Sequence, residues 1–149
     1  MRLSRQSDYA IRITFAVAQQ TGGANTQTDV ASIAHQTGIP QAYTAKLVQS
    51  LAKAGVLRTQ KGPRGGVRLA ATAEDITLQQ IVEAVEGPTE FARCLLWPGE
   101  CPPHANCPMH MVLDGLTEVV TRYLSSVTLA DLLARGEHAS PMPYGPVQS

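Results

Sequence analysis

Apolar residues in the first half of the chain recur mainly at intervals of three and four, which is the spacing of helices that bury one face. The first such stretch covers residues 5–20, and Ser4 stands before it as a helix-capping residue. Two shorter stretches follow at residues 29–36, with Thr28 as the expected cap, and at residues 41–54. The pattern therefore predicts three successive helices.

The second and third predicted helices are joined by Thr37-Gly38-Ile39-Pro40, a short turn that contains glycine. Two short helices joined in this way form a helix-turn-helix, whose second helix enters the major groove in proteins that bind DNA. The spacing of Tyr43, Leu47 and Leu51 marks the packed side of that helix. On the exposed side, the candidate DNA contacts are Gln41, Thr44 and Lys46.

Directly after the third helix, residues 56–60 and 67–69 alternate apolar with polar or basic side chains, as short strands do. Between them lies the glycine-rich tip Lys61-Gly62-Pro63-Arg64-Gly65-Gly66. A basic hairpin in this place is the wing of a winged-helix domain, and its glycines allow close approach to the DNA backbone. Lys61 and Arg64 are candidate contacts to phosphates or to a minor groove. The predicted fold is mainly α-helical with a small β-hairpin wing.

The charge distribution changes along the chain, although the formal net charge of the 149 residues is zero. Residues 1–72 hold nine Lys and Arg against two acids, whereas the remainder holds three against ten. A basic half followed by an acidic half suggests that only the first faces a polyanion such as DNA. No apolar stretch is long enough for a membrane span, and the N-terminus lacks the apolar core of a signal peptide, so we expect a cytoplasmic protein.

The second half of the chain is organised differently. Thr77 can cap a helix over residues 78–86, after which residues 88–107 lose all periodicity. From Pro108 to Leu124 an apolar stripe indicates a long amphipathic helix, which we interpret as packing on a second copy of the chain, with packing on its own domain as the alternative. The expected division is a winged helix-turn-helix domain (1–87), a cysteine-bearing cluster loop (88–110), a dimerisation helix with a short C-terminal helix (111–135) and a disordered tail (136–149).

All three cysteines, Cys94, Cys101 and Cys107, lie within this aperiodic stretch or at its end, and His110 follows three residues later. Thiolates so concentrated in a cytosolic protein favour zinc or an iron–sulfur cluster. Structural zinc sites usually use closely spaced cysteine pairs, which are missing here, and electron-carrying clusters normally have four cysteines. A cluster held by three cysteines is easier to lose or attack, which suits a sensor. His110 lies one helical turn after Cys107 and can reach the same metal.

These features together resemble the winged-helix iron–sulfur transcription regulators of the IscR, NsrR and RirA type, a family that also includes the cluster-free cysteine-metabolism regulator CymR. The resemblance covers residues 1–134 and implies a homodimer that binds a two-fold symmetric DNA operator. It rests on several motifs in the same order along the chain: Met1-Arg2-Leu3-Ser4, Asp8-Tyr9-Ala10-Ile11-Arg12, the wing from Lys61 to Leu69, Ile76-Thr77-Leu78, Val85-Glu86-Gly87, the three cysteines and Val127-Thr128-Leu129-Ala130-Asp131-Leu132.

The resemblance implies two alternative cluster chemistries. IscR-like proteins bind a [2Fe–2S] cluster through three cysteines and a histidine three residues after the last, which His110 matches. NsrR-like proteins bind a [4Fe–4S] cluster through three cysteines and an aspartate in the first helix of the other subunit, which Asp8 matches. Because the first cysteine gap is one residue longer than is usual in IscR, we favour Asp8 and [4Fe–4S], with His110 and [2Fe–2S] as the alternative.

The recognition helix departs from the IscR-like pattern. Two serines and a glutamate that help to choose among operators there are Pro40, Ala42 and Ala45 here, so we expect a different operator. Tyr43 is retained as a further candidate DNA contact, and the wing cation is Lys61. The rival interpretations are a zinc-stabilised or cluster-free DNA-binding regulator and, from another class, an iron–sulfur redox protein. No nucleophile–base motif is present, so we do not expect an enzyme.

Overall fold

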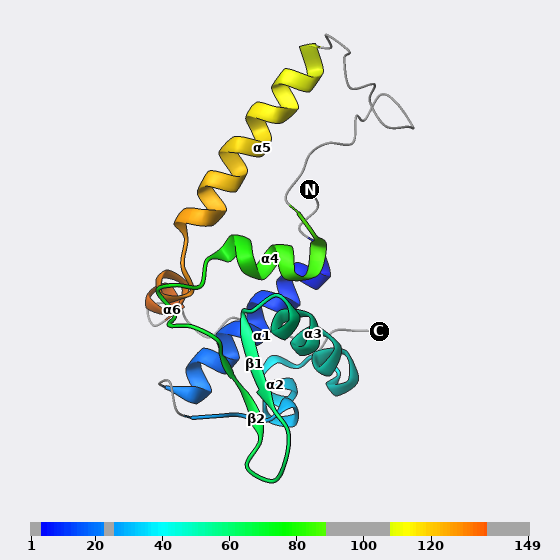
Figure 1. Cartoon of the computed structure of the whole chain (residues 1–149), viewed down its shortest axis with the longest axis vertical. Helices are drawn as coiled ribbons and strands as arrows, with labels where there is room; N and C mark the ends of the chain where they lie inside the picture. Colours follow the sequence, from blue (N-terminus) through cyan, green and yellow to red (C-terminus); the bar gives the residue numbers. More distant parts are fainter. Residues whose placement is uncertain (1–3, 23–25, 89–107, 137–149) are drawn as a thin grey trace.

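A computed structural model describes residues 4–22, 26–88 and 108–136 of the chain (Figure 1). Within these ranges six helices accompany one antiparallel two-stranded hairpin, which confirms the predicted mainly α-helical fold with a β-hairpin wing. In chain order the elements are α1 (Arg5–Thr21), α2 (Val30–Thr37), α3 (Gln41–Lys53), β1 (Leu57–Gln60), β2 (Gly66–Leu69), α4 (Leu78–Glu86), α5 (Pro108–Ser126) and α6 (Leu129–Gly136).

Helix α1 forms the centre of the core. It begins after Ser4, whose Oγ accepts a hydrogen bond from the backbone N–H of Gln6 at 3.1 Å, as the sequence predicts. It ends at Gly22, whose φ of 49° is the left-handed conformation that commonly closes a helix. Ile13 and Val17 are fully buried where α1 packs against α2, α3 and α4. The helix-turn-helix and the wing are therefore assembled around α1.

Helices α2 and α3 form the predicted helix-turn-helix, with Gly38 in the left-handed conformation at the turn. The prediction of Thr28 as the cap of α2 is wrong, because Asp29 caps it through a hydrogen bond from the Ser32 N–H to its Oδ1 at 2.9 Å. The backbone of Thr28 instead exchanges two hydrogen bonds with Val67, at 2.9 and 2.6 Å. Its backbone is thus paired with the sheet and its hydroxyl donates to Oε1 of Gln20, so its side chain does not cap α2.

The wing pairs β1 with β2, with Leu57 opposite Leu69 and Gln60 opposite Gly66. Leu57 and Val67 point into the core, where they are 1% and 3% exposed. The bridge between Thr28 and Val67 adds a third short extended segment to the hairpin. The wing is therefore joined to the start of α2 by backbone hydrogen bonds as well as by the chain.

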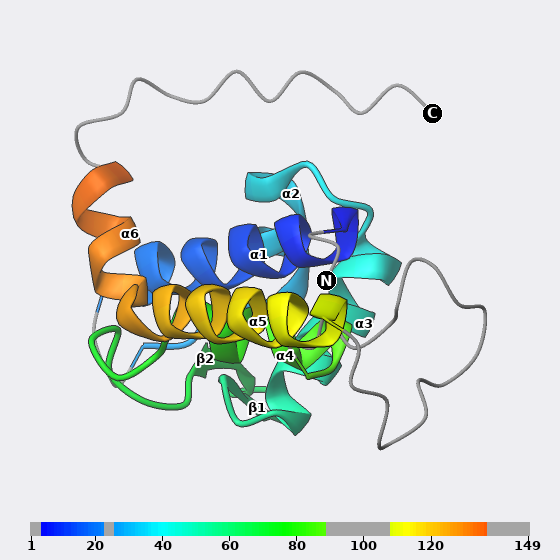
Figure 2. The same ribbon diagram turned by 90° about the horizontal axis from the view of Figure 1, so that it is seen from above.

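The C-terminal part of the chain returns to the body of the protein. Leu129, the first residue of α6, is fully buried, and hydrogen bonds of 2.8 Å join Leu78 N–H to Val127 O and Leu129 N–H to Ile76 O. The C-terminal end of α5 lies beside α4, while the N-terminal end of α5 points away from the body (Figures 1 and 2). Within the described ranges, no helix is long and apolar enough to cross a membrane.

Candidate DNA-binding surface and metal ligands

The outward face of α3 is polar and basic. Gln41 and Lys46 are exposed, as predicted, and the same face continues through Gln49 to Lys53. Gln49 and Lys53 were not among the predicted contacts, although they follow Lys46 at intervals of three and four, the spacing of neighbours on one helix face. The helix contains no acidic residue, so this face presents only amides, methyl groups and cations to a polyanion.

Thr44 does not belong to that face, so its prediction as an exposed DNA contact is wrong. Its side chain is fully buried, and its hydroxyl donates to the carbonyl of Pro40 at 3.2 Å. Leu47, Val48 and Leu51 are buried with it. Thr44 precedes these residues by three, four and seven positions, so it lies on the packed stripe of the helix.

Tyr43 connects the recognition helix to α1. Its side chain is half-buried, and its ring meets the ring of Tyr9 edge-on, with the ring centres 5.8 Å apart and an interplanar angle of 76°. This is a favourable aromatic geometry. The ring that was predicted to contact DNA thus takes part in the contact between α3 and α1, and a role in DNA binding stays a prediction.

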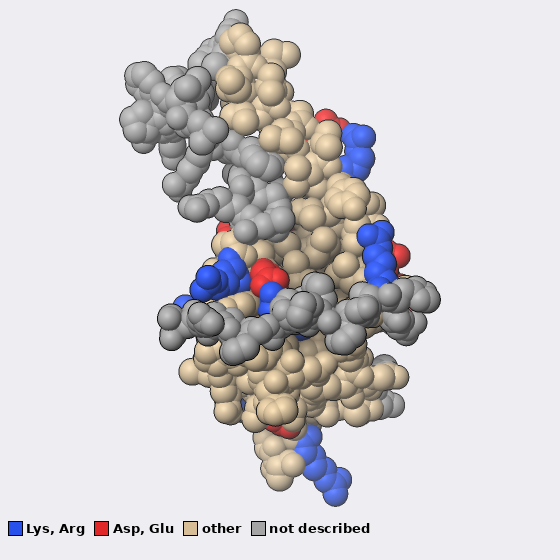
Figure 3. Space-filling model, turned by 180° about the vertical axis from the view of Figure 1, so that it is seen from behind, with Lys and Arg blue, Asp and Glu red and all other residues tan. Residues whose placement is uncertain are grey.

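The tip of the wing carries the two predicted cations, Lys61 and Arg64, both exposed. Its tight path depends on glycine, because a Cβ on Gly65 would overlap the carbonyl of Gln60, and Gly62 has a φ of 106°. Figure 3 shows Lys and Arg side chains reaching furthest from the surface at the wing end, while the end formed by α5 is mostly uncharged. Two cations on a tight, protruding turn can contact the phosphates of a nucleic-acid backbone.

The base of the wing is held by residues that precede α2. Gln27 donates from Nε2 to Oε1 of Gln60 at 3.0 Å. Gly66 lies so close to this segment that a Cβ on it would be 2.7 Å from the Thr28 carbonyl oxygen and 2.9 Å from the Gln27 Cβ. A hollow of about 410 Å³ beside these residues is lined partly by the cross-strand pair Arg58 and Arg68. The wing is therefore basic along its strands as well as at its tip.

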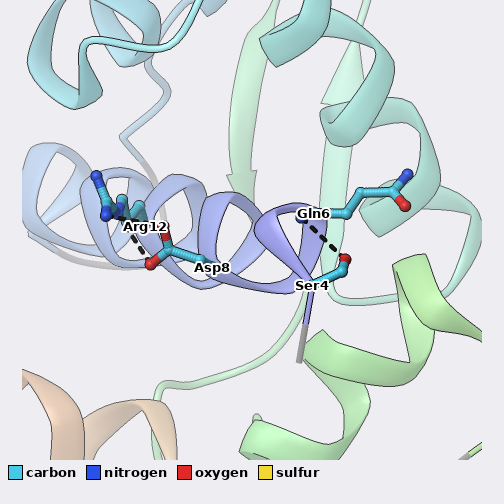
Figure 4. A network of polar contacts seen from close by, with 4 residues as sticks. All are labelled: Ser4, Gln6, Asp8 and Arg12. Atoms are coloured by element: carbon cyan, nitrogen blue, oxygen red, sulfur yellow. Dashed lines mark hydrogen bonds and ion pairs between the residues drawn. The ribbon is translucent and has the colours of Figure 1, made fainter. Parts of the chain in front are cut away.

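Asp8, the favoured fourth metal ligand, lies on the first turn of α1 with its side chain 48% exposed (Figure 4). It forms an ion pair with Arg12, in which Arg12 Nη2 lies 2.7 Å from Asp8 Oδ2. The Arg12 guanidinium also lies over the ring of Tyr9, 5.9 Å from the ring centre. A chain of contacts thus runs from Asp8 through Arg12 and Tyr9 to Tyr43 on the recognition helix.

Glu86 connects the end of α4 to the start of α1. Its Oε1 accepts hydrogen bonds from the hydroxyl groups of Ser4 and of Ser7, the latter at 2.5 Å, and Ser7 is fully buried. Partial burial alone would raise the pKa of Glu86, but these hydrogen bonds outweigh it and hold that pKa below its usual range. The carboxylate therefore fixes the point at which the chain leaves α4 toward the cysteine-bearing segment.

The alternative ligand, His110, lies on the first turn of α5. Its side chain is 54% exposed, and Nε2 lies 3.4 Å from Asp114 Oδ2. Asp8 and His110 are on elements that flank the cysteine segment, α1 beside the end of α4 and α5 directly after the segment. Cys94, Cys101 and Cys107 themselves lie outside the described residues, so the predicted ligand set stays a prediction. Among the residues that are described, no cluster of three or more His, Cys, Asp or Glu side chains could hold a metal ion.

Comparison with protein families and curated proteins gives one consistent match. Residues 3–135 match the model of the Rrf2 family, described as an iron-dependent transcriptional regulator. The HTH-type transcriptional regulator IscR of Vibrio vulnificus (strain YJ016) is 28% identical over 137 residues, which cover 92% of this chain and 80% of the relative. Protein aau3 of Rhizobium meliloti (strain 1021) is 30% identical over 135 residues, which cover 89% of this chain and 85% of the relative.

Solved structures give the same picture. CymR, the global cysteine regulator of B. subtilis, superposes with a TM-score of 0.72 at 25% identity and covers 91% of this chain and 98% of its own. IscR of T. potens superposes with a TM-score of 0.70 at 26% identity and covers 97% of this chain and 95% of its own. The likeness therefore includes the winged domain, α5 and α6 together.

Proposed function

The chain belongs to the Rrf2 family of iron-dependent transcriptional regulators, and we propose that it acts as a homodimer whose DNA binding responds to an iron–sulfur cluster. Its relatives are DNA-binding transcription regulators and not enzymes, as predicted. The observation that carries the proposal is the combination, in one chain, of a basic surface on α3 and the wing with an uncovered apolar face on α5 at the other end.

The homodimer is supported by the outward face of α5. An exposed apolar stripe of this length marks an interaction site, and two-fold dimers pair the same patch of two copies. The exposed apolar residues of α5 follow one another at alternating intervals of three and four, which is the pattern of a helix that packs on another helix. We therefore propose that a second copy covers the α5 stripe, which consists of Met109, Val112, Leu116, Val119 and Tyr123, each 42% to 64% exposed.

The cluster is proposed from the donor set. Three thiolates with one carboxylate or imidazole are ligands that iron accepts, and the bound group would supply sensitivity to redox state, nitric oxide or iron supply. Asp8 suits the fourth position because its side chain is 48% exposed and can be reached from outside its own subunit. Its partner Arg12 is only 22% exposed and also lies over the ring of Tyr9, so taking Asp8 from Arg12 would change contacts inside the protein. We keep [4Fe–4S] with Asp8 as the preferred form.

The contacts of Asp8 also suggest how cluster status would reach the DNA. When Asp8 binds a metal in the other subunit, Arg12 loses its ion pair with Asp8, and its contact with the ring of Tyr9 changes as a result. Tyr9 packs on Tyr43, and Tyr43 belongs to the recognition helix. Binding of the metal by Asp8 thus changes the contacts of the recognition helix. Only such a difference in contacts between two states can change the affinity for DNA.

The cluster proposal is tested by anaerobic purification, followed by absorption and Mössbauer spectroscopy of the wild type, Asp8→Ala and His110→Ala. We expect a coloured wild-type protein whose spectra change in Asp8→Ala and stay the same in His110→Ala. Glu118→Ala, which removes another exposed carboxylate, serves as the control. A colourless zinc-loaded protein would contradict the proposal. A metal-free protein that still binds its operator would favour the cluster-free alternative, which the likeness to CymR supports.

The wing is tested through the salt dependence of DNA binding. The logarithm of the DNA-binding constant falls linearly with the logarithm of the salt concentration, and each phosphate contact that is lost should reduce the magnitude of this negative slope by about 0.9. We expect the double variant Lys61→Ala/Arg64→Ala to bind DNA of any sequence more weakly and with a shallower slope. Arg122→Ala removes an exposed cation on α5 and should leave the slope unchanged. An unaltered slope in the wing variant would contradict its proposed role.

A further inference from the structure

The first two turns of α3 present an unusual set of groups on the surface that faces DNA in the proposed function, on which this inference rests. Gln41 and Ala42 are exposed, and Ala45 is partly exposed on the same side of the helix. Thr44 is buried, and Tyr43 is half-buried against Tyr9. The leading end of the recognition helix therefore offers one amide and two methyl groups beside the half-buried ring of Tyr43.

These groups correspond to particular base edges in the major groove. The 5-methyl group of thymine is the apolar feature of that groove, and an alanine side chain is one of its usual contacts. A glutamine amide can donate to N7 and accept from N6 of adenine at the same time. Both preferences point to A·T pairs. Lys46, one turn after Ala42, is the first cation on this face and suits guanine or a phosphate.

The groups that would select cytosine are absent from this face. Reading the cytosine amino group usually takes a carboxylate, and α3 contains no Asp or Glu from Gln41 to Lys53. The hydroxyl of Thr44 already donates to a carbonyl of its own helix and is fully buried. Near the start of α3, the exposed surface can therefore distinguish bases through methyl contacts and through the amide of Gln41.

We propose that the start of α3 selects A·T pairs in each half-site, with Ala42 and Ala45 contacting thymine methyl groups and Gln41 contacting adenine. The two alanines then determine specificity and are more than neutral helix formers. The inference concerns which base pairs this surface selects, so it can fail while the proposed function stands.

The experiment removes single methyl groups from the DNA. A tight-binding duplex is first selected from a random pool with the wild-type protein, and each thymine is then replaced in turn by deoxyuridine, which keeps base pairing but lacks the methyl group. Dissociation constants are measured by fluorescence anisotropy at one fixed salt concentration. At two positions in each half-site we expect binding to weaken about fourfold, the factor that corresponds to one methyl group losing its burial.

Protein variants assign these positions to residues. In Ala42→Ser and Ala45→Ser the uracil penalty should vanish at one position each, whereas Ala54→Ser, which changes an exposed alanine at the far end of α3, should preserve both penalties. Replacing adenine by 7-deazaadenine removes N7. It should weaken binding of the wild type about fivefold or more and should have no effect on Gln41→Ala.

Each outcome decides something different. Penalties that vanish in the matching variants support the inference. Tight operator binding without any uracil penalty overturns it and leaves the proposed function intact, and penalties that persist in both serine variants overturn the assignment to the alanines. If no duplex in the pool is bound more tightly than bulk DNA, the sequence-specific operator binding in the proposed function fails, and the inference fails with it.

Discussion

The two longest helices of the described chain, α1 and α5, are covered in opposite ways. Eight of the 17 residues of α1 are buried, against one of the 19 residues of α5. Both sequences show a regular apolar stripe, so the pattern alone does not distinguish them. What differs is the source of the covering surface, which for α1 is the rest of the same chain. A stripe therefore predicts that a face is buried but does not say by which chain.

The contrast in burial between α1 and α5 predicts its largest effect on stability for a substitution in the core around α1. Ile13 is fully buried, and Ile13→Ala should lower the free energy of unfolding by about 2–5 kcal/mol through lost burial and the cavity left behind. The matched change on α5, Met111→Ala, removes a side chain that is 78% exposed and should change it by about 0.5 kcal/mol or less. Urea unfolding measures both, and similar losses would contradict the contrast.

The next effect concerns association. The double variant Val112→Glu/Val119→Glu places two charges in the α5 stripe and should raise the dimer dissociation constant about 30-fold or more, as loss of central interface contacts does. Sedimentation velocity measures this, with Glu118→Gln on the same helix as the control. An unchanged dimer would mean that another surface holds the subunits together, and a lost fold would mean that α5 is covered by its own chain.

Local features of the fold could be predicted from the sequence. Ser4 and Thr77 cap their helices as expected, because capping depends on residues only a few positions apart. The position of Thr28 could not be predicted in the same way, since its backbone pairs with Val67, 39 positions later, and this long-range contact transfers the cap to Asp29. Propensity identifies a capping residue, but tertiary pairing decides which neighbour is available.

The candidate site was predicted less completely than the fold. Gln41 and Lys46 are exposed as expected, but Thr44 lies on the packed side, because the interpretation placed the buried stripe about one residue out of phase. The same error concealed Gln49 and Lys53, which continue the true outer face. A short helix has few apolar positions, so its sequence alone defines the direction of its buried face only to within about one residue. In the folded protein, packing against the core around α1 determines which residues of α3 are buried.

A smaller effect is expected at the edge of the core, where Gly66 of the wing lies against the segment that precedes α2. Gly66→Ala would place a methyl group 2.7 Å from the Thr28 carbonyl oxygen, and the overpacking should cost about 1–3 kcal/mol and weaken DNA binding by displacing the wing. Gly115→Ala on α5 meets no atom within 4 Å and should stabilise the helix by about 0.5–1 kcal/mol. Thermal unfolding and anisotropy compare the two variants, and equal costs would contradict the contrast.

The smallest effect tests the polar end of α1, where Glu86 accepts hydrogen bonds from Ser4 and Ser7. Because these bonds hold the pKa of Glu86 below its usual range, the folded protein binds its proton less readily than the unfolded chain does. The stabilisation is therefore present above the ordinary carboxyl pKa of about 4.3 and is lost as the pH falls below it. Glu86→Gln should reduce the loss of stability between pH 7 and acidic pH, by less than about 1 kcal/mol because the group is partly in solvent. Urea midpoints across this range measure it, with Glu118→Gln as a control, and identical pH profiles for wild type and Glu86→Gln would show that α1 and α4 are not joined through this carboxylate.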